Sequence, residues 1–233
     1  MSTPAANVTN TSGTYNFAPS LGETVLYSFG LCGVRATALT QSHFETARMA
    51  ANLMMSAWSA RGVNLWQVDS QQITLQQGCS TYQVPSNTIV MLDMYITHTT
   101  GIDRVVMPIS RTEYANFPNK QQQGFPNCAW FDRLLSPTVT LWPVPDSTVK
   151  CLHYYRLRQS QDSILGNGAS IEIPTYFWDA FALGLAWRLA LTWAPAQAPM
   201  LKPLADEAYN FAATQNVESS NYYLAPMIGG YFR

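Results

Sequence analysis

The chain has 233 residues, enough for one large domain or two small ones around a substantial buried core. Charged residues make up 12% of it, about half the usual share, and aromatic residues make up another 12%. This composition favours a protein whose surface is largely covered by partners over a monomer with an uncharged polar surface. The net charge of −1 excludes a globally basic nucleic-acid-binding protein.

The cysteines show no spacing typical of a metal site, and the pairing of Cys151 with His153, two residues on, is weak. In a chain of this length we expect four free, mostly buried thiols in a reducing compartment rather than a disulfide framework. These cysteines are Cys32, Cys79, Cys128 and Cys151.

One apolar stretch, residues 176–194, has the length of a membrane span. It contains Asp179 and Arg188, and each would cost roughly 2.5–3.5 kcal/mol near the centre of a bilayer. We therefore expect a buried helix and no membrane insertion. The polar N-terminal segment also lacks the pattern of a signal peptide.

Residues 1–18 have no apolar period and are expected to form a flexible arm. A capping-box pattern at Ser20–Glu23 then predicts the start of a helix that ends at Gly33. A second capping-box pattern, Ser42 with Glu45, predicts a helix that ends at Gly62. Apolar residues at helical spacing predict the buried sides of these two helices. They are Leu21, Val25, Leu26 and Phe29 in the first helix, and Phe44, Ala47, Ala51, Met54, Met55 and Trp58 in the second.

The middle of the chain is rich in short β-strand patterns separated by turn residues. The runs at 71–75, 80–85, 89–96 and 102–110 predict a small antiparallel sheet of hairpins. A third capping box at 110–113 predicts a short helix, and a polar loop follows at 119–127. A second set of strands is predicted at 129–135, 138–142 and 149–157.

The chain becomes helical again at Pro174, where Thr175 is a candidate cap, and this helix reaches Trp193. A last helix is predicted over about 199–216, and Pro203 either starts it or kinks it. The predicted fold class is therefore α+β: a helical bundle from the N- and C-terminal helices, a β-rich middle insertion of hairpins, and extended terminal arms. The predicted bounds are 1–18 for the N-terminal arm, 19–62 and 174–216 for the bundle, 63–173 for the insertion, and 217–233 for the C-terminal arm.

No motif in the sequence points to catalysis, and we predict no catalytic residue, metal site or cofactor. The three histidines, His43, His98 and His153, are far apart in sequence. Glu23 and Glu45 form the best candidate carboxylate pair, but both occupy predicted capping positions.

The stretch LWPVPD, residues 141–146, places two prolines two residues apart after a strand. Pro143 and Pro145 fix the backbone at alternate positions, so the stretch predicts a stiff elbow at a sheet edge. We interpret Trp142 and these prolines as structural markers, together with Trp58 and Trp178, which are expected in the core.

Several segments together resemble the head-to-tail adaptor (head completion) proteins of short-tailed bacteriophages. The resemblance covers about residues 20–216. The segments, in order, are LGETVLYSFG (21–30), ANLMMSAWSARG (51–62), a strand pair around 73–85, MPISRTEY (107–114), GFPNCAWF (124–131), LWPVPD (141–146), and VKCLHYYRLR (149–158) leading to IEIPTYFWDAFALGLAWRLALTW (171–193).

This resemblance implies a non-enzymatic structural virion protein, made in the host cytoplasm. It implies a homo-oligomeric ring, usually twelvefold, that binds the portal protein on one side and a tail nozzle or tail-fibre protein on the other. Genomic DNA would pass through the ring without sequence-specific binding. The near-neutral charge agrees with this role, because neutralisation of phosphates by Lys and Arg is what makes DNA bind.

The C-terminal arm is the preferred docking segment, because four aromatic residues in a 17-residue stretch with two charges are costly to leave in water. The candidate docking residues are Tyr222, Tyr223, Leu224, Tyr231 and Phe232.

Three alternatives stay open from the sequence. A virion-associated peptidoglycan hydrolase would need Glu23, Glu45 or Asp132 to converge. A glycan- or receptor-binding tail module would use exposed Trp and Tyr residues of the β-rich insertion. A nozzle or stopper ring of the same machine is the nearest rival.

Overall fold

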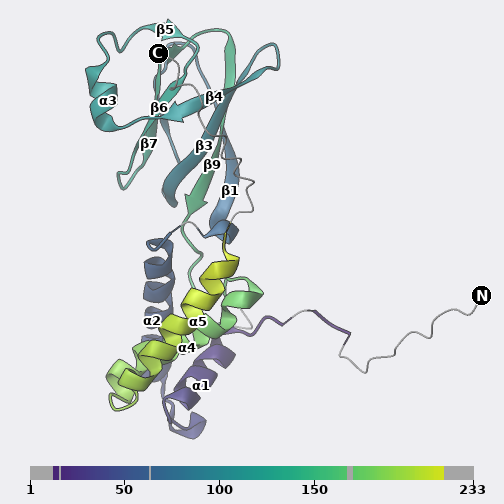
Figure 1. The fold of residues 1–233 in the computed structure, drawn as a ribbon, viewed down its shortest axis with the longest axis vertical. Helices are drawn as coiled ribbons and strands as arrows, with labels where there is room; N and C mark the ends of the chain where they lie inside the picture. The colour runs from purple at the N-terminus through teal and green to yellow at the C-terminus, as the bar shows by residue number, and fades with distance from the viewer. Residues whose placement is uncertain (1–12, 16, 63, 167–169, 218–233) are drawn as a thin grey trace, which may run out of the picture. The chain divides into compact units, whose positions relative to one another are not determined.

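The computed structural model describes residues 13–15, 17–62, 64–166 and 170–217. It is a mixed α+β structure that separates into two compact units (Figure 1). The helical unit comprises the chain up to Met54 together with Gln161–Ala212, and the sheet unit comprises Met55–Ser160 and the chain from Ala213. The chain therefore passes from one unit to the other inside two of its helices and once after a strand.

The described residues form five α-helices and a seven-stranded sheet with a small two-stranded one beside it. The helices are α1 (Leu21–Leu31), α2 (Gln41–Ser59), α3 (Arg111–Asn116), α4 (Trp178–Trp193) and α5 (Ala198–Gln215). The strands are β1 (Val68–Thr74), β2 (Thr81–Gln83), β3 (Thr88–His98), β4 (Asp103–Pro108), β5 (Gln123–Gly124), β6 (Cys128–Asp132), β7 (Thr138–Trp142), β8 (Val144–Pro145) and β9 (Val149–Arg158).

The centre of the helical unit is the packing of α1 against α4. Two small side chains one turn apart on α1 donate hydrogen bonds to backbone carbonyls one turn apart on α4. The Ser28 hydroxyl donates to the Ala182 carbonyl (3.0 Å) and the Cys32 thiol donates to the Ala186 carbonyl (3.2 Å). All four residues are buried, so the two helices approach closely enough for side chains on one to reach the backbone of the other.

The two ends of α1 follow the sequence signals. Ser20 and Glu23 form the predicted capping box, in which each side chain binds the other's backbone N–H. At the other end Gly33 has a φ of +77°, and the next amide, of Val34, donates to the Phe29 carbonyl (3.0 Å). This left-handed turn is why a glycine follows the helix. The predicted apolar side was wrong at Leu26, which is 43% exposed.

The start of α2 differs from the prediction. The helix begins at Gln41, so Ser42 and Glu45 lie inside it, and the predicted capping box was wrong. Instead, the Thr40 backbone N–H donates to Nδ1 of His43 (3.2 Å), and the Thr40 hydroxyl contacts the same nitrogen (2.7 Å). The imidazole of His43, three residues after Thr40, thus accepts the backbone N–H that a glutamate side chain accepts in the usual capping box. Glu45 instead accepts a hydrogen bond from the Gln41 side chain (2.9 Å).

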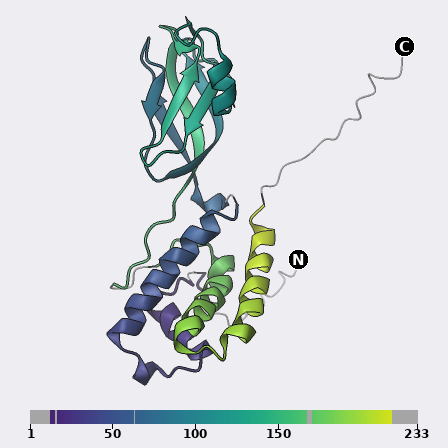
Figure 2. The same cartoon turned by 90° about the vertical axis from the view of Figure 1, so that its left-hand side faces the viewer.

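The C-terminal helices are entered by short turns. The predicted cap at Thr175 was wrong, because Thr175–Phe177 form a 3₁₀ turn and no side chain caps α4. Helix α5 contains Pro203 in its interior, where the ring removes one helical N–H. In Figure 2, α4 (green) lies between α2 (blue) and α5 (yellow), and contacts of its side chains with both neighbours fix this order. The His43 ring stacks on Trp193 (3.8 Å), and Lys202 lies over Trp187 (5.9 Å).

All the long strands join one sheet, in the order β1-β9-β3-β4-β6-β7-β2. The predicted first sheet of hairpins is confirmed for β3 and β4, which pair antiparallel, and is wrong for β1 and β2, which pair with strands of the predicted second set. The first predicted strand pairs with β9, and β2 pairs with β7. The β4–β6 pair is parallel. The segment between them, with α3 and the polar loop, is long enough for the crossover that a parallel pair needs.

The sheet curls around its own core (Figure 2). Residues that alternate along β3, β6, β7 and β9 supply most of this core, so the period of two seen in the sequence marks its inner face. The buried core residues are Leu75, Val84, Met91, Met94, Ile96, Val106, Ala129, Val139, Leu141, Val149, Leu152 and Tyr154.

The double-proline stretch, residues 141–146, holds the crossover segment between β4 and β6 against the sheet. The Trp142 ring stacks on Phe117 (3.9 Å), and its Nε1–H donates to the Asn119 carbonyl (3.0 Å). The Trp142–Pro143 peptide is cis, and β8 then pairs in parallel with β5 of the crossover loop. Val144 and Pro145 are both buried, so this stretch is not an exposed sheet edge.

One buried arginine connects three strands of the sheet. Arg156 on β9 lies opposite Asp69 on β1 and binds both of its carboxylate oxygens (2.7 and 3.1 Å). Its third nitrogen donates to the side chains of Asn87 and Thr88 at the start of β3 (2.8 Å each). The guanidinium therefore has acceptors on both sides, which offsets the cost of burying its charge.

We expect Arg156→Met to lower the free energy of unfolding by about 2–4 kcal/mol, because it leaves Asp69 with only the longer contact to Arg158 (3.8 Å) and the side chains of Asn87 and Thr88 without this donor. Urea unfolding followed by circular dichroism measures this. The matched control is Arg104→Met, which removes an exposed guanidinium that lies over the Phe125 ring (4.9 Å) and should cost less than about 1 kcal/mol. Equal losses in the two variants would contradict the role given to Arg156.

The same contact makes stability depend on pH. Hydrogen bonds from Arg156 lower the pKa of Asp69 below its ordinary value. The stabilisation is therefore fully present above the unfolded pKa of about 3.9 and is lost as the pH falls through the lower, folded pKa. The stability difference between the protein and its Asp69→Asn variant should shrink below about pH 4. A difference that stays constant from neutral pH to pH 3 would contradict this.

Candidate functional site

The candidate carboxylates for hydrolysis are engaged in local structure. Glu23 accepts hydrogen bonds from the backbone and hydroxyl of Ser20 (2.8 and 2.9 Å), and Glu45 accepts one from Gln41. Asp132 lies at the end of β6, opposite Thr138, in the sheet unit. Glu23 and Glu45 thus have separate local partners, and Asp132 lies in the other unit.

The three histidines have different surroundings. His43 packs in the helical unit against Trp193 and Phe29. His98 contacts Thr100 in the turn between β3 and β4 (2.8 Å). His153 stacks on Tyr95 (4.8 Å), and its Nε2 lies 2.9 Å from the Cys151 thiol, so the weak sequence pairing is a real contact.

All four cysteines are free, and Cys32 is buried while the other three are partly buried. Over the described part of the chain, no group of three or more His, Cys, Asp or Glu residues could hold a metal ion. Among the same residues, no helix is long and apolar enough to cross a membrane.

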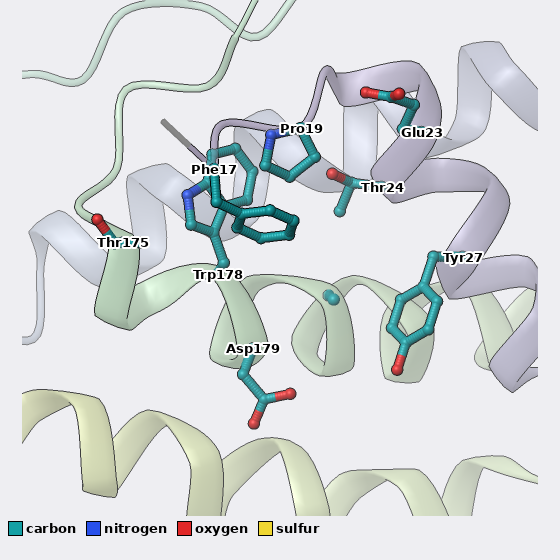
Figure 3. Close-up of a pocket in the computed structure, with 9 residues that line it drawn as sticks. Phe17, Pro19, Glu23, Thr24, Tyr27, Thr175, Trp178 and Asp179 are labelled. Carbon is teal, nitrogen blue, oxygen red and sulfur yellow. The ribbon is translucent and has the colours of Figure 1, made fainter. Parts of the chain in front are cut away.

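A pocket of about 600 Å³ lies between α1, the segment that precedes it and the start of α4. Most of its lining is apolar or aromatic. Figure 3 shows Phe17, Pro19 and Trp178 gathered at one end and Tyr27 at the other. The lining residues are Phe17, Pro19, Glu23, Thr24, Tyr27, Thr175, Trp178, Asp179 and Ala182.

The rim of this pocket is acidic. Glu23 and Asp179 are the charged residues of the lining, and Figure 3 shows them on opposite rims. Hydrogen bonds from the Ser20 backbone and hydroxyl lower the pKa of Glu23, so it is ionised at neutral pH. Aromatic walls beneath carboxylates suit an aromatic side chain or the stem and cation of a lysine or arginine.

A second hollow of about 520 Å³ lies between α2 and α4. Its wall carries three large apolar side chains, Met49, Leu53 and Leu191, each 56% exposed. The full lining is Glu45, Thr46, Met49, Ala50, Leu53, Arg188, Leu191 and Thr192. We call this surface the α2/α4 groove. It lacks a pair of groups suited to acid–base chemistry and is suited to docking.

The residues named as structural markers lie in both units. Trp58 and Trp178 are buried, and Trp178 also forms part of the pocket floor. Trp142, Pro143 and Pro145 are part of the stretch that holds the crossover loop. The candidate docking residues Tyr222, Tyr223, Leu224, Tyr231 and Phe232 lie outside the described residues.

Sequence reasoning missed both hollows. Their walls are formed by residues on the outward sides of α1, α2 and α4. Apolar residues at helical spacing predict only the buried sides of these helices. The sequence did contain one signal, because these helices have more large apolar residues than one buried stripe needs. Tyr27, Met49 and Leu191 are examples. Which of them face a common hollow depends on how the helices pack.

The α1–α4 contact predicts an unreactive thiol. Burial raises the pKa of Cys32 to about 11, so little of it is thiolate at pH 8. We expect a thiol-specific reagent to label Cys32 at least about tenfold more slowly than Cys79, with mass spectrometry of the labelled peptides as the readout. In guanidinium chloride both should react at similar rates. Equal rates in the folded protein would contradict the packing of Cys32 against α4.

Comparison with known proteins gives one family. No curated protein matches the chain. A family model described as SU10 adaptor protein matches residues 34–223, which is most of the chain. The match includes α2, α4, α5 and the whole sheet unit up to Ser160, and it begins after α1. The chain therefore belongs to the SU10 adaptor protein family, which indicates a structural adaptor protein of a phage.

Proposed function

We propose that this protein forms a twelvefold ring that joins the capsid portal to the tail and continues the DNA channel. Membership of the adaptor family is the observation that carries the proposal, because an adaptor has to bind other virion proteins. The partners are further copies of the chain, the portal protein, and a tail nozzle or tail-fibre protein. The protein would be made in the host cytoplasm and end in the virion.

The surface of the helical unit supports an assembling subunit. Large apolar side chains of this unit are each more than two-fifths exposed, and three of them lie together on the wall of the α2/α4 groove. They include Leu26, Tyr27, Met49, Leu53, Tyr176, Leu191, Met200, Leu204 and Phe211. A ring subunit buries two such flanks against its neighbours and further surface against the rings above and below.

The charge pattern supports a channel through which DNA slides. The chain has 13 Lys and Arg residues against 14 Asp and Glu, so the ring has no net positive field. Since binding to DNA depends on the neutralisation of phosphates by cations, a near-neutral subunit would hold the genome weakly.

The C-terminal arm, residues 217–233, is proposed as the segment that docks on the portal. Its aromatic residues Tyr222, Tyr223, Tyr231 and Phe232, with Leu224, would fill a groove on the portal surface.

Electron microscopy of the purified protein, alone and mixed with portal protein, tests the ring. We expect closed rings of uniform diameter coaxial with the portal, because the flanks of the helical unit are apolar on more than one side. The number of subunits follows from rotational averaging. A protein that stays monomeric in the presence of portal would overturn the proposal.

Replacing Tyr222, Tyr223, Tyr231 and Phe232 together by serine tests the arm while keeping its length. We expect at least about tenfold weaker binding to the portal, or about 1.4 kcal/mol, in a sedimentation or interferometry assay. Leu135→Ser, at a fully exposed loop residue of the sheet unit, is the control and should bind like the parent protein. Unchanged portal binding by the arm variant would exclude this docking role.

A further inference from the structure

We propose that the acidic aromatic pocket binds the guanidinium of Arg35 from a neighbouring copy of the chain, so that copies join head to tail. The acidic aromatic pocket is the hollow of about 600 Å³ between α1, the segment that precedes it and the start of α4. The inference deepens the proposed function and rests on it, since it assigns two surfaces that would form the ring.

The walls of this pocket suit a cation carried on an apolar stem. Phe17 is 69% exposed and Tyr27 58% exposed, although both line the pocket, and Trp178 forms its floor. Figure 3 shows the rings of Phe17 and Trp178 at one end and the ring of Tyr27 at the other. A guanidinium is planar and stacks on aromatic rings, while its methylene stem packs against apolar surface. An arginine side chain therefore matches both the rings and the depth of the hollow.

The two carboxylates at the rim can accept from such a cation. Figure 3 shows Glu23 and Asp179 on opposite rims. Both hydrogen bonds from the Ser20 side chain and backbone end on Oε2 of Glu23, which leaves Oε1 able to accept. Asp179 is exposed in the first turn of α4, and among the described residues its carboxylate has no hydrogen-bond or ion-pair partner. A guanidinium has five donors and can bind both carboxylates at once.

The helical unit itself offers cations without partners. Its cationic residues are Arg35, Arg48, Arg188 and Lys202. Lys202 lies over the Trp187 ring, and Arg188 has contacts of its own. The guanidinium groups of Arg35 and Arg48 are exposed and have no partner among the described residues. Charge complementarity therefore makes a second copy of this chain a suitable occupant of the pocket.

The position of Arg35 suits insertion better than that of Arg48. Arg35 precedes the 3₁₀ turn Ala36–Ala38 between α1 and α2, and all three residues of that turn are small and exposed. Small neighbours let the rim of a pocket close around the arginine. Arg48 lies inside α2, so the whole helix would have to approach the rim before its side chain could enter.

The two surfaces lie at opposite ends of α1. Glu23 is in the first turn of the helix, and Arg35 follows its last residue by four positions. The 11 residues of α1 span about 16 Å, so Arg35 and the pocket are separate patches of one subunit. A contact between two different patches is heterologous, and repeated with a closing rotation it generates a ring.

The surroundings of the contact give it more strength than an exposed ion pair. Charges that are fully in water gain little when they pair, because solvent screens them. Here the rings of Phe17, Tyr27 and Trp178 would exclude water from the guanidinium, which strengthens both the cation–π contacts and the hydrogen bonds to the carboxylates.

Disulfide trapping tests the pairing while keeping Arg35 and both carboxylates. An Ala36→Cys protein is mixed with a separately tagged Thr175→Cys protein and oxidised, both alone and in rings assembled on the portal. Both positions are exposed, one beside Arg35 and one in the pocket lining. The background has serine at the partly buried cysteines and keeps buried Cys32; the replaced residues are Cys79, Cys128 and Cys151.

We expect cross-linked heterodimers at about tenfold or more the yield of a mixture of Ala36→Cys with Leu135→Cys, because a disulfide forms only where the two Cα atoms come within about 7 Å. Leu135 is the control because it is 99% exposed in the sheet unit. Cross-links mainly between two copies of position 36 would overturn the pairing.

Removal of the arginine tests whether the pocket holds it. Arg35→Gln in the Ala36→Cys protein should lower the yield of the cross-link about tenfold, because the amide carries no charge for the rings and carboxylates. Arg48→Gln is the matched control, since it removes the other exposed arginine without a partner among the described residues of the helical unit. Equal losses in the two variants would overturn the assignment of Arg35.

A charge exchange tests the other side of the contact. Asp179→Arg in the Thr175→Cys protein and Arg35→Asp in the Ala36→Cys protein should each lower the yield about tenfold, and the two together should recover most of it. Asp206→Arg, at an exposed residue of α5, should leave the yield unchanged. Circular dichroism melting confirms that each variant is folded.

The outcomes separate this inference from the proposed function. Rings that form on the portal without the 36–175 cross-link would overturn the pairing and leave the ring role standing. A strong cross-link that Arg35→Gln abolishes, in a protein that forms no ring on the portal, would support the pairing and overturn the ring. Loss of the cross-link with Arg233→Gln and not with Arg35→Gln would give the pocket to the C-terminal arm and overturn the pairing.

Discussion

The close contact between α1 and α4 is the constraint on which the helical unit depends. The hydroxyl of Ser28 and the thiol of Cys32 donate to carbonyls of α4, which is possible only because small residues let the helices approach. With α1 held on one side of α4, the other sides of α4 are left for α2 and α5, and the outward residues of all four helices become surface. The acidic aromatic pocket and the α2/α4 groove follow from this arrangement.

The sheet unit is held by polar contacts at its ends and an apolar core between them. Arg156 fastens β9 to β1 and to the start of β3, and Trp142 fastens the crossover loop to the end of β7. Both are polar or aromatic groups with specific partners, so they fix the register of strands that apolar packing alone leaves less specified. The low charge of the chain is thus combined with a few well-placed ionic contacts.

The exposed apolar residues of the helical unit connect structure to assembly. An adaptor protein is stable as part of a larger particle, so its surface does not need the charge that keeps a monomer soluble. The wall of the α2/α4 groove carries such residues, and the family match includes both of its helices.

The sequence by itself determined the local elements: the capping boxes of α1 and α3, the glycine after α1, the alternating strands and the mixed α+β class. The sequence also carried the resemblance to phage adaptors, because that resemblance consists of short segments in a fixed order along the chain. Only the tertiary structure decided that His43 caps α2, that β4 and β6 pair in parallel, and that Leu26 faces outward. The reason is physical: caps and turns depend on neighbours within a few residues, whereas strand partners and the hollows between helices depend on contacts between residues far apart in the chain.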